Sequence, residues 1–181
     1  TENFIFEDNV VGGRVPREYI PSVEKGFRAV LGKGPIAGFP IVGVKASLED
    51  GSYHDVDSSD MAFQTCARAG FREAFLATKP VLLEPIMKME VEVPSDFQGP
   101  VTGELNKRRG LIVSTETVGK SSTIIAEVPL AETFGYSTDL RSMTQGQGVF
   151  TMEFSRYRAT PGNIQKEIVE ERKKQELAAA K

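Results

Sequence analysis

The segment IMKMEVEV, residues 86–93, alternates apolar and charged side chains without a break after its first residue. Because successive side chains of a strand point to opposite faces, its methionines and valines lie on one face and its charged residues on the other. The pattern predicts a strand with one buried and one solvated face, which is typical of an antiparallel sheet. A second alternating segment, QGVFTMEFSRY at residues 147–157, predicts another such strand.

Helix and turn signals lie between these two segments. A capping-box pattern at residues 95–98 opens an apolar series with helical spacing, and Gly110 follows the basic run 107–109. The predicted elements are a helix from Ser95 to Gly110, strands over 111–117 and 122–129, and a helix over 131–145. The order β-α-β-β-α-β predicts an α+β fold of the ferredoxin-like, split βαβ type, with two helices on one face of an antiparallel sheet.

The stretch KPVLLEP, residues 79–85, is the predicted boundary between two domains, 1–83 and 84–160, because its prolines disfavour helix in the residues before them. The first domain has helical periodicity over 17–31 and 58–78 and an alternating strand over 42–48 that ends at Asp50-Gly51. A last helix with a solvated end is predicted for 161–181, starting at Pro161.

Composition excludes several classes of protein. The net charge is −3, so any contact with nucleic acid depends on a few placed side chains and not on a positive field. The single cysteine, Cys66, excludes an internal disulfide and is predicted to be a buried packing residue. No apolar run approaches the ~18 residues that cross a bilayer, and the acidic start TENFIFEDNV does not fit a signal peptide. We therefore expect a soluble protein of a reducing compartment, most simply the cytoplasm.

The only histidine, His54, lies in DGSYHDVDSS, residues 50–59. A metal site needs three or four converging ligands, and the chain has no second histidine and no second cysteine. A hydrolase using His54 with Asp55 or Asp57 would also need a nucleophile and an oxyanion hole, and no G-x-S-x-G motif occurs. We expect neither a metal nor a catalytic residue here, although the hydrolase stays open as a distant alternative.

A third interpretation divides the segment between two roles. Asp57, Ser58 and Asp60 are suited to starting a helix, with Ser58 as its cap. Tyr53 and His54 are not needed for that purpose, and they offer a stacking surface and a hydrogen-bond donor to RNA.

Two other segments carry weaker signals. TETVGKSS, residues 115–122, resembles a phosphate-binding loop, but such a loop needs its first glycine at position 114, where this chain has serine. Predicted strands flank the segment on both sides, so it is predicted to be a turn. The run Lys107-Arg108-Arg109 fits either the C-terminus of a helix or a contact with phosphate.

Five stretches resemble the elongation factor G family of translational GTPases, in that family's order, over about residues 10–158. They are GGRVPREYIPSVEKG, IAGFPIVGVKASLEDGSYHDVDSSDMAF, KPVLLEPIMKMEVEVP, GELNKRRG and PLAETFGYSTDLRSMTQGQGVFTMEFSRY. The resemblance implies most of the family's fourth domain, with a left-handed βαβ crossover and without its N-terminal strand, followed by the ferredoxin-like fifth domain. It also implies that helix 161–181 packs back onto the fourth domain, and that a strand edge is exposed where the missing strand would pair.

The resemblance also implies a function. The tip of the fourth domain enters the decoding region of the small ribosomal subunit, where it meets tRNA and mRNA and promotes translocation. The implied contacts with tRNA and small-subunit RNA are Gly51, Ser52, Tyr53, His54, Asp55, Val56 and Asp57. Large-subunit RNA near the factor-binding region is the expected partner of Arg108, Arg109 and Arg141.

Further expectations concern the parent protein. GTP and Mg²⁺ belong to a GTPase domain that is missing from these 181 residues, so the chain itself is expected to be no enzyme and to hold no cofactor or metal. We expect a monomer, an unmodified His54 and no membrane contact, in a bacterial cytoplasm or an organelle. A paralogue acting in ribosome recycling or tetracycline protection remains an alternative.

Overall fold

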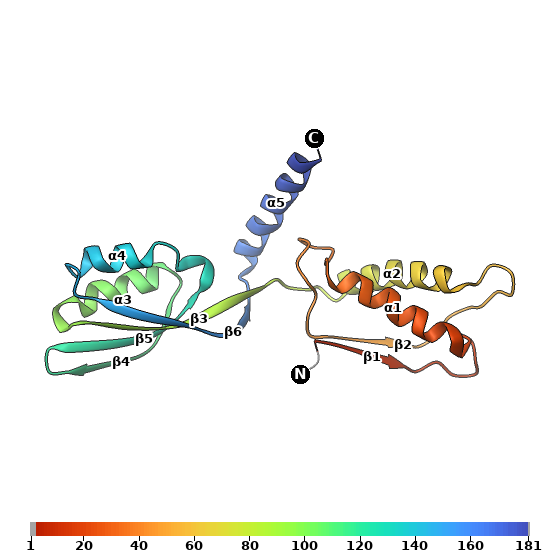
Figure 1. Cartoon of the computed structure of the whole chain (residues 1–181), viewed down its shortest axis with the longest axis horizontal. Helices are drawn as coiled ribbons and strands as arrows, with labels where there is room; N and C mark the ends of the chain where they lie inside the picture. Colours follow the sequence, from red (N-terminus) through yellow and green to blue (C-terminus); the bar gives the residue numbers. More distant parts are fainter. Residues whose placement is uncertain (1–2, 181) are drawn as a thin grey trace. The chain divides into compact units, whose positions relative to one another are not determined.

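The computed structural model describes residues 3–180, so positions 1–2 and 181 of the predicted end segments lie outside the described residues. The chain divides into two compact units (Figure 1). The N-terminal unit comprises Thr1–Pro80 together with Asn163–Lys181, and the C-terminal unit comprises Val81–Gly162. Each unit contains both helices and strands, as the predicted α+β class requires.

The C-terminal unit is a four-stranded antiparallel sheet of order β4-β5-β3-β6. Its strands are β3 (Leu83–Pro94), β4 (Leu111–Val118), β5 (Ser121–Pro129) and β6 (Val149–Ala159). Helices α3 (Gln98–Lys107) and α4 (Tyr136–Met143) lie on the same side of this sheet (Figure 1). The ferredoxin-like order β-α-β-β-α-β is therefore confirmed.

Alternation in β3 produces the predicted burial. Met89, Val91 and Val93 are at most 2% exposed, whereas Lys88, Glu90 and Glu92 face water. Apolar residues of α3, β5 and α4 complete the core. They are Val101, Leu105, Ile124, Ala126, Val128, Tyr136 and Leu140. Burial raises the pKa of Tyr136 to about 12, and its hydroxyl has no hydrogen-bond partner among the described residues.

Two predicted helix starts in this unit are wrong in detail. Ser95 makes no capping hydrogen bond; it opens a short 3₁₀ turn, Ser95–Phe97, and α3 begins at Gln98. The predicted helix 131–145 is a 3₁₀ turn, Leu130–Glu132, followed by α4, because Gly135 between them adopts a left-handed conformation with φ of 76°.

The N-terminal unit is built on a two-stranded parallel sheet, β1 (Phe4–Asp8) and β2 (Val44–Leu48). A 3₁₀ turn, Arg17–Tyr19, leads into α1 (Ile20–Leu31), which connects the two strands, and α2 (Asp60–Ala77) follows β2. In this sheet each strand has one edge without a β partner among the described residues. The strand β1 was not predicted from the sequence.

Helices α1 and α2 approach each other closely at Gly26. A Cβ atom there would lie 2.6 Å from the carbonyl oxygen of Gln64 and 2.7 Å from Cβ of Ala67. Ala67 and Phe71 face this contact, and Phe71 packs with Phe4 in the core of the unit. Cys66 is exposed, contrary to its predicted burial, because it precedes Ala67 on the helix and therefore points about 100° away from the buried stripe.

The last helix, α5 (Gly162–Ala179), has no fully buried residue. It groups with the N-terminal unit, where Arg172 lies over the ring of Phe39 at 4.5 Å and Lys33 is 4.0 Å from Glu176. Among residues 3–180, no helix has both the length and the apolar composition that a membrane span requires.

Candidate functional site

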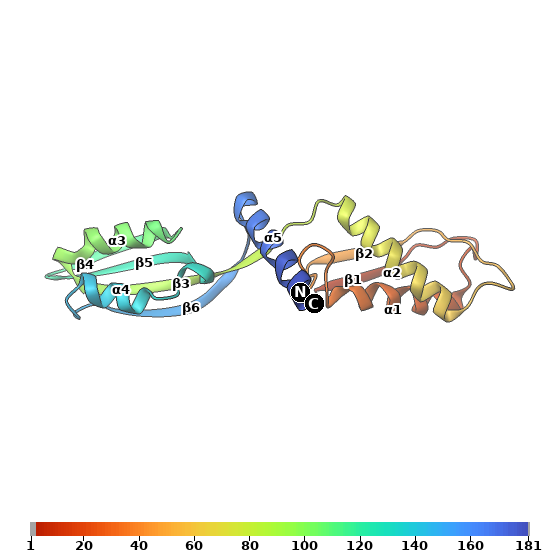
Figure 2. The same cartoon turned by 90° about the horizontal axis from the view of Figure 1, so that it is seen from above.

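Two loops leave the β1–β2 sheet at the same end because the two strands are parallel (Figures 1 and 2). We call residues 9–16, after β1, the companion loop, and residues 50–58, after β2, the tip loop. Polar contacts join the loops and the residues beside them: Asn9 Nδ2 donates to Glu49 Oε1 at 2.9 Å, and Arg14 Nη1 donates to Asp50 Oδ2 at 2.6 Å. The two loops therefore form one surface.

The tip loop is held at its first residues. The backbone N–H of Gly51 and the guanidinium of Arg14 both stabilise the Asp50 carboxylate, which lowers its pKa. Gly51 lies so close to buried Val15 that a Cβ atom would be 2.5 Å from Cγ2 of that valine. A larger residue at position 51 would therefore push the tip loop away from the companion loop.

The apex of the tip loop is a single closed turn. The backbone N–H of Ser58 donates to the carbonyl of His54 at 3.0 Å, and the N–H of His54 donates to Ser58 Oγ at 2.8 Å. Between them the side chains extend into solvent: His54 and Asp57 have side-chain exposures of 76% and 82%, and Val56 is 86% exposed. The two hydrogen bonds that close the turn use the backbone of His54 and Ser58 and the Ser58 hydroxyl, and these side chains stay in solvent.

The predicted helix cap is wrong by one residue. Ser59 caps α2, its Oγ accepting from the N–H of Ala62 at 3.1 Å, because the hydroxyl of Ser58 is bonded to His54. Asp60 lies in the first turn of α2, as predicted. Its carboxylate accepts at 2.6 Å from both Ser22 Oγ and Gln64 Nε2, and these hydrogen bonds lower its pKa. The bond to Ser22 connects the start of α2 to the start of α1.

Tyr53 is supported by two other rings. Its ring stacks on that of Tyr19 with centroids 5.9 Å apart at 30°, and Tyr19 stacks on Phe63 at 4.7 Å and 17°. The pKa of Tyr53 is raised, first by the partial burial of its hydroxyl and then by the negative charge of Asp55. Tyr19, Arg14 and Val15 were missed from the sequence, because nothing in a linear pattern pairs them with residues more than thirty positions away.

The geometry does not support the acid–base interpretation. His54 Nδ1 is 3.6 Å from Asp57 Oδ2, but both side chains stand in water on the same turn, and Ser58 Oγ is bonded to the backbone. Within residues 3–180 no hydrogen bond joins a nucleophile to the imidazole, and the His54 and Asp57 side chains are 76% and 82% exposed. Across residues 3–180, no three His, Cys, Asp or Glu side chains are grouped so as to hold a metal ion.

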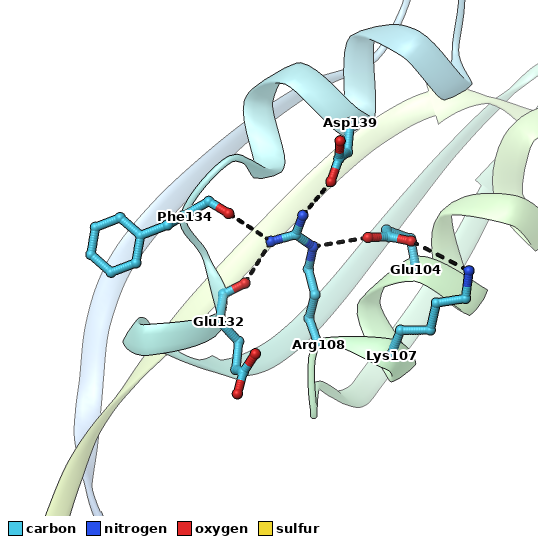
Figure 3. A network of polar contacts seen from close by, with 6 residues as sticks. All are labelled: Glu104, Lys107, Arg108, Glu132, Phe134 and Asp139. Atoms are coloured by element: carbon cyan, nitrogen blue, oxygen red, sulfur yellow. Dashed lines mark hydrogen bonds and ion pairs between the residues drawn. The ribbon is translucent and has the colours of Figure 1, made fainter. Parts of the chain in front are cut away.

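Arg108 is the centre of a polar network in the C-terminal unit (Figure 3). Its guanidinium donates to the carboxylates of Glu104 and Asp139 and to the backbone carbonyls of Glu132 and Phe134. Its side chain is 13% exposed and lies 5.3 Å from the centre of the Tyr136 ring. This arginine therefore connects the end of α3 to the loop before α4 and to α4 itself.

The other two arginines predicted to contact RNA differ from each other. Arg109 donates to both oxygens of Glu84, at 2.5 and 3.1 Å, and this carboxylate, only 8% exposed as a residue, raises the pKa of the arginine. Arg141 is exposed at the end of α4, and its side chain has no recorded partner among the described residues. Nothing in the sequence distinguishes these three arginines, and their contact with RNA stays a prediction.

Comparisons with known proteins agree with this division into two units. The family described as "Elongation factor G, domain IV" matches residues 1–79, and the family described as "Elongation factor G C-terminus" matches residues 81–168. The chain belongs to the elongation factor G family. Together the two elongation factor G matches cover both sheets and the whole tip loop.

Individual relatives support the assignment. Elongation factor G of Rhodopirellula baltica is 63% identical over 180 residues, which are 99% of this chain and 26% of that protein. Elongation factor G 1 of Syntrophus aciditrophicus is 54% identical over 179 residues, again 99% of this chain and 26% of that protein. A crystal structure of a Thermus thermophilus protein matches with a TM-score of 0.80 and 42% identity, covering 95% of this chain and 26% of the other. The chain thus spans about a quarter of the length of its elongation factor G relatives.

Proposed function

We propose that this chain is the ribosome-binding part of a translation elongation factor, and that residues 51–57 of the tip loop contact tRNA and small-subunit RNA while tRNA and mRNA are translocated. The observation that carries the proposal is the apex of the tip loop: a turn fixed by its backbone and by Ser58, with His54 exposed. A fixed turn loses little conformational freedom on binding, so its contacts contribute to affinity with little entropic cost.

The proposed mechanism is steric and uses hydrogen bonds, with no covalent step. The imidazole of His54 and the backbone of the turn can donate to or accept from RNA bases and riboses. GTP and Mg²⁺ bind, in this proposal, to a GTPase domain of a longer parent protein, and the residues described above hydrolyse nothing. The parent acts as a monomer on the ribosome, where tRNA and mRNA are its further partners.

We expect the change His54→Ala in the full-length factor to slow translocation about tenfold, the effect of losing one or two hydrogen bonds at the interface. Ribosome-stimulated GTP hydrolysis should stay within about twofold, because the tip loop carries no group that acts on nucleotide, and thermal stability should hardly change for so exposed a side chain. Rapid-mixing measurements of translocation and of phosphate release would test both rates.

Cys66→Ala, an exposed change on α2 outside the tip loop, is the matched control and should translocate at the normal rate. Normal translocation by the His54 variant would remove this residue from the mechanism. Slower ribosome recycling with normal translocation would favour the recycling paralogue instead.

We also propose that the C-terminal unit contacts large-subunit RNA, with Arg141 as a phosphate contact, since Arg108 and Arg109 use their donors within the unit. Arg141→Gln in the full-length factor should weaken ribosome binding and reduce the slope of log K against log salt by about one. Lys88→Gln, the same loss of charge on the open face of the sheet, is the control. Equal changes in slope for the two variants would mean that Arg141 acts only through net charge.

A further inference from the structure

Three aromatic rings form a column that ends at the surface of the N-terminal unit. Phe63 on α2 stacks on Tyr19, and Tyr19 stacks on Tyr53, with interplanar angles of 17° and 30°. Phe63 and Tyr19 are half-buried, whereas Tyr53 is 42% exposed. The inner face of the Tyr53 ring is therefore covered, and across the described residues no further ring is recorded against its outer face.

The elements that carry the column are fixed to each other. Tyr19 ends the 3₁₀ turn before α1, and Phe63 lies in the first turn of α2. The hydrogen bond from Ser22 to Asp60 joins the starts of these two helices at 2.6 Å, with Ser22 only 4% exposed. The orientation of Tyr53 is thus set by two helices and not only by its own loop.

The surroundings of Tyr53 select the kind of ligand. Asp55 and Glu18 place negative charge near its hydroxyl, and Asp57 is exposed on the same loop. These carboxylates repel a phosphate group. A flat, uncharged ring system can still stack on the outer face, since every nucleobase has such a face.

We infer that the outer face of Tyr53 is a stacking site for an unpaired nucleobase, with Tyr19 and Phe63 as positioning residues that hold the Tyr53 ring. The inference rests on the proposed function of the tip loop, and it assigns to that loop a ligand chemistry and two supporting residues outside it. The base continues the column of rings by one member. The contact is neutral, so it does not depend on counterion release.

The test uses the 181-residue chain without ribosomes. Adenosine and ribose, which share the sugar, carry no phosphate and differ in the base, are titrated while the tyrosine ring protons are followed by NMR. Adenosine should move the Tyr53 ring signals upfield, and ribose should leave them in place. Tyr19→Leu should weaken the apparent affinity about fivefold, the effect of losing one aromatic pair, and Tyr19→Phe should keep it.

Tyr157 is an internal control. It is 62% exposed, but its neighbouring ring, Phe154, is tilted by 59° and gives no parallel support. Equal shifts at Tyr157 and Tyr53 would show that any exposed tyrosine stacks, and would overturn the inference. So would equal shifts with ribose, or an unchanged affinity in Tyr19→Leu.

If the NMR methyl signals of Tyr19→Leu show that this variant is not folded, Phe63→Leu replaces it and tests the next ring of the column. The same weakening of affinity is expected. An unchanged affinity in Phe63→Leu would overturn the positioning role. The outcome of this stacking test is independent of the outcome of the translocation test of His54. A stacking site with normal translocation in His54→Ala removes His54 from the mechanism and leaves the stacking inference standing. Slow translocation without stacking removes only the inference.

Discussion

Replacing Arg108 with alanine should lower the free energy of unfolding of the C-terminal unit by about 3 kcal/mol, the cost of removing one member of a partly buried ionic network. The guanidinium bonds two carboxylates and two backbone carbonyls, and its removal leaves those acceptors without their donor. Hydrogen exchange at the amides of β5 in the whole chain would measure the change in this unit separately from the other.

The neighbouring residue is the control for this change. Lys107 belongs to the same basic run, but its side chain is 80% exposed and its only recorded ion pair, with Glu104, is 3.7 Å long. Lys107→Ala should change stability by less than about 0.5 kcal/mol. Similar losses in the two variants would show that Arg108 stabilises the unit through helix charge alone. Arg108→Lys should recover only part of the loss, because one ammonium cannot reproduce the planar fork.

A methyl group at Gly26 should destabilise the N-terminal unit by about 2 kcal/mol, the usual effect of overpacking. Its Cβ would meet the backbone of Gln64 and the Cβ of Ala67, neither of which can move without moving α2. Separation of α1 and α2 would also disturb the ring column and the bond between Ser22 and Asp60. Urea unfolding followed by hydrogen exchange in α2 would measure the loss.

The change Gly70→Ala should increase the free energy of unfolding, whereas Gly26→Ala should lower it. Gly70 lies in α2, and among the described residues nothing beyond its chain neighbours and the nearby backbone of its own helix comes within 4 Å of a Cβ atom placed there. Alanine there should stabilise the helix by up to about 1 kcal/mol, since it restricts the unfolded chain and favours helix. Destabilisation at both positions by a similar amount would rule out the close approach of the helices as the cause at Gly26.

The C-terminal fold was predictable because its signals are local. The alternation that predicts β3 and the signals that end the helices of this unit each span only a few residues. A period of two is enough to predict the strand, and a glycine after a basic run is enough to predict a helix end. The break in the predicted helix 131–145 was not predictable in the same way. A glycine in a helical pattern is compatible with either a continued helix or a turn, and in the structure Gly135 is left-handed and α4 starts after it.

The N-terminal unit shows where local signals fail. The strand β1 has five residues, FIFED, and its pairing with β2 spans forty positions of sequence. The sequence predicts Cys66 on the apolar side of its helix, although the stripe that faces α1 runs through Ala67 and Phe71. Contacts between distant segments decided both cases.

In the candidate site, too, the features with local sequence signals were predicted and those that depend on distant segments were not. Its position after a strand and before a helix was predicted, from the end of the alternating pattern and from the residues that start α2. The predicted tight turn at Asp50-Gly51 is wrong, because the chain turns at residues 55–57 instead. The support of the site was not predicted, because Arg14, Val15 and Tyr19 come from the companion loop and the 3₁₀ turn that follows it. The sequence also could not show that Ser58 closes the apex and leaves the capping of α2 to Ser59.

The closed turn at residues 54–58 has a consequence for how such a protein can evolve. Its two hydrogen bonds use the backbone of His54 and the backbone and hydroxyl of Ser58, and none of the side chains of Asp55, Val56 and Asp57. Substitutions at these three positions should therefore leave both closing hydrogen bonds in place, although a change at Asp55 or Asp57 also removes its contact with Tyr53 or His54. The scaffold would keep presenting one loop shape while the chemistry displayed at its apex is exchanged.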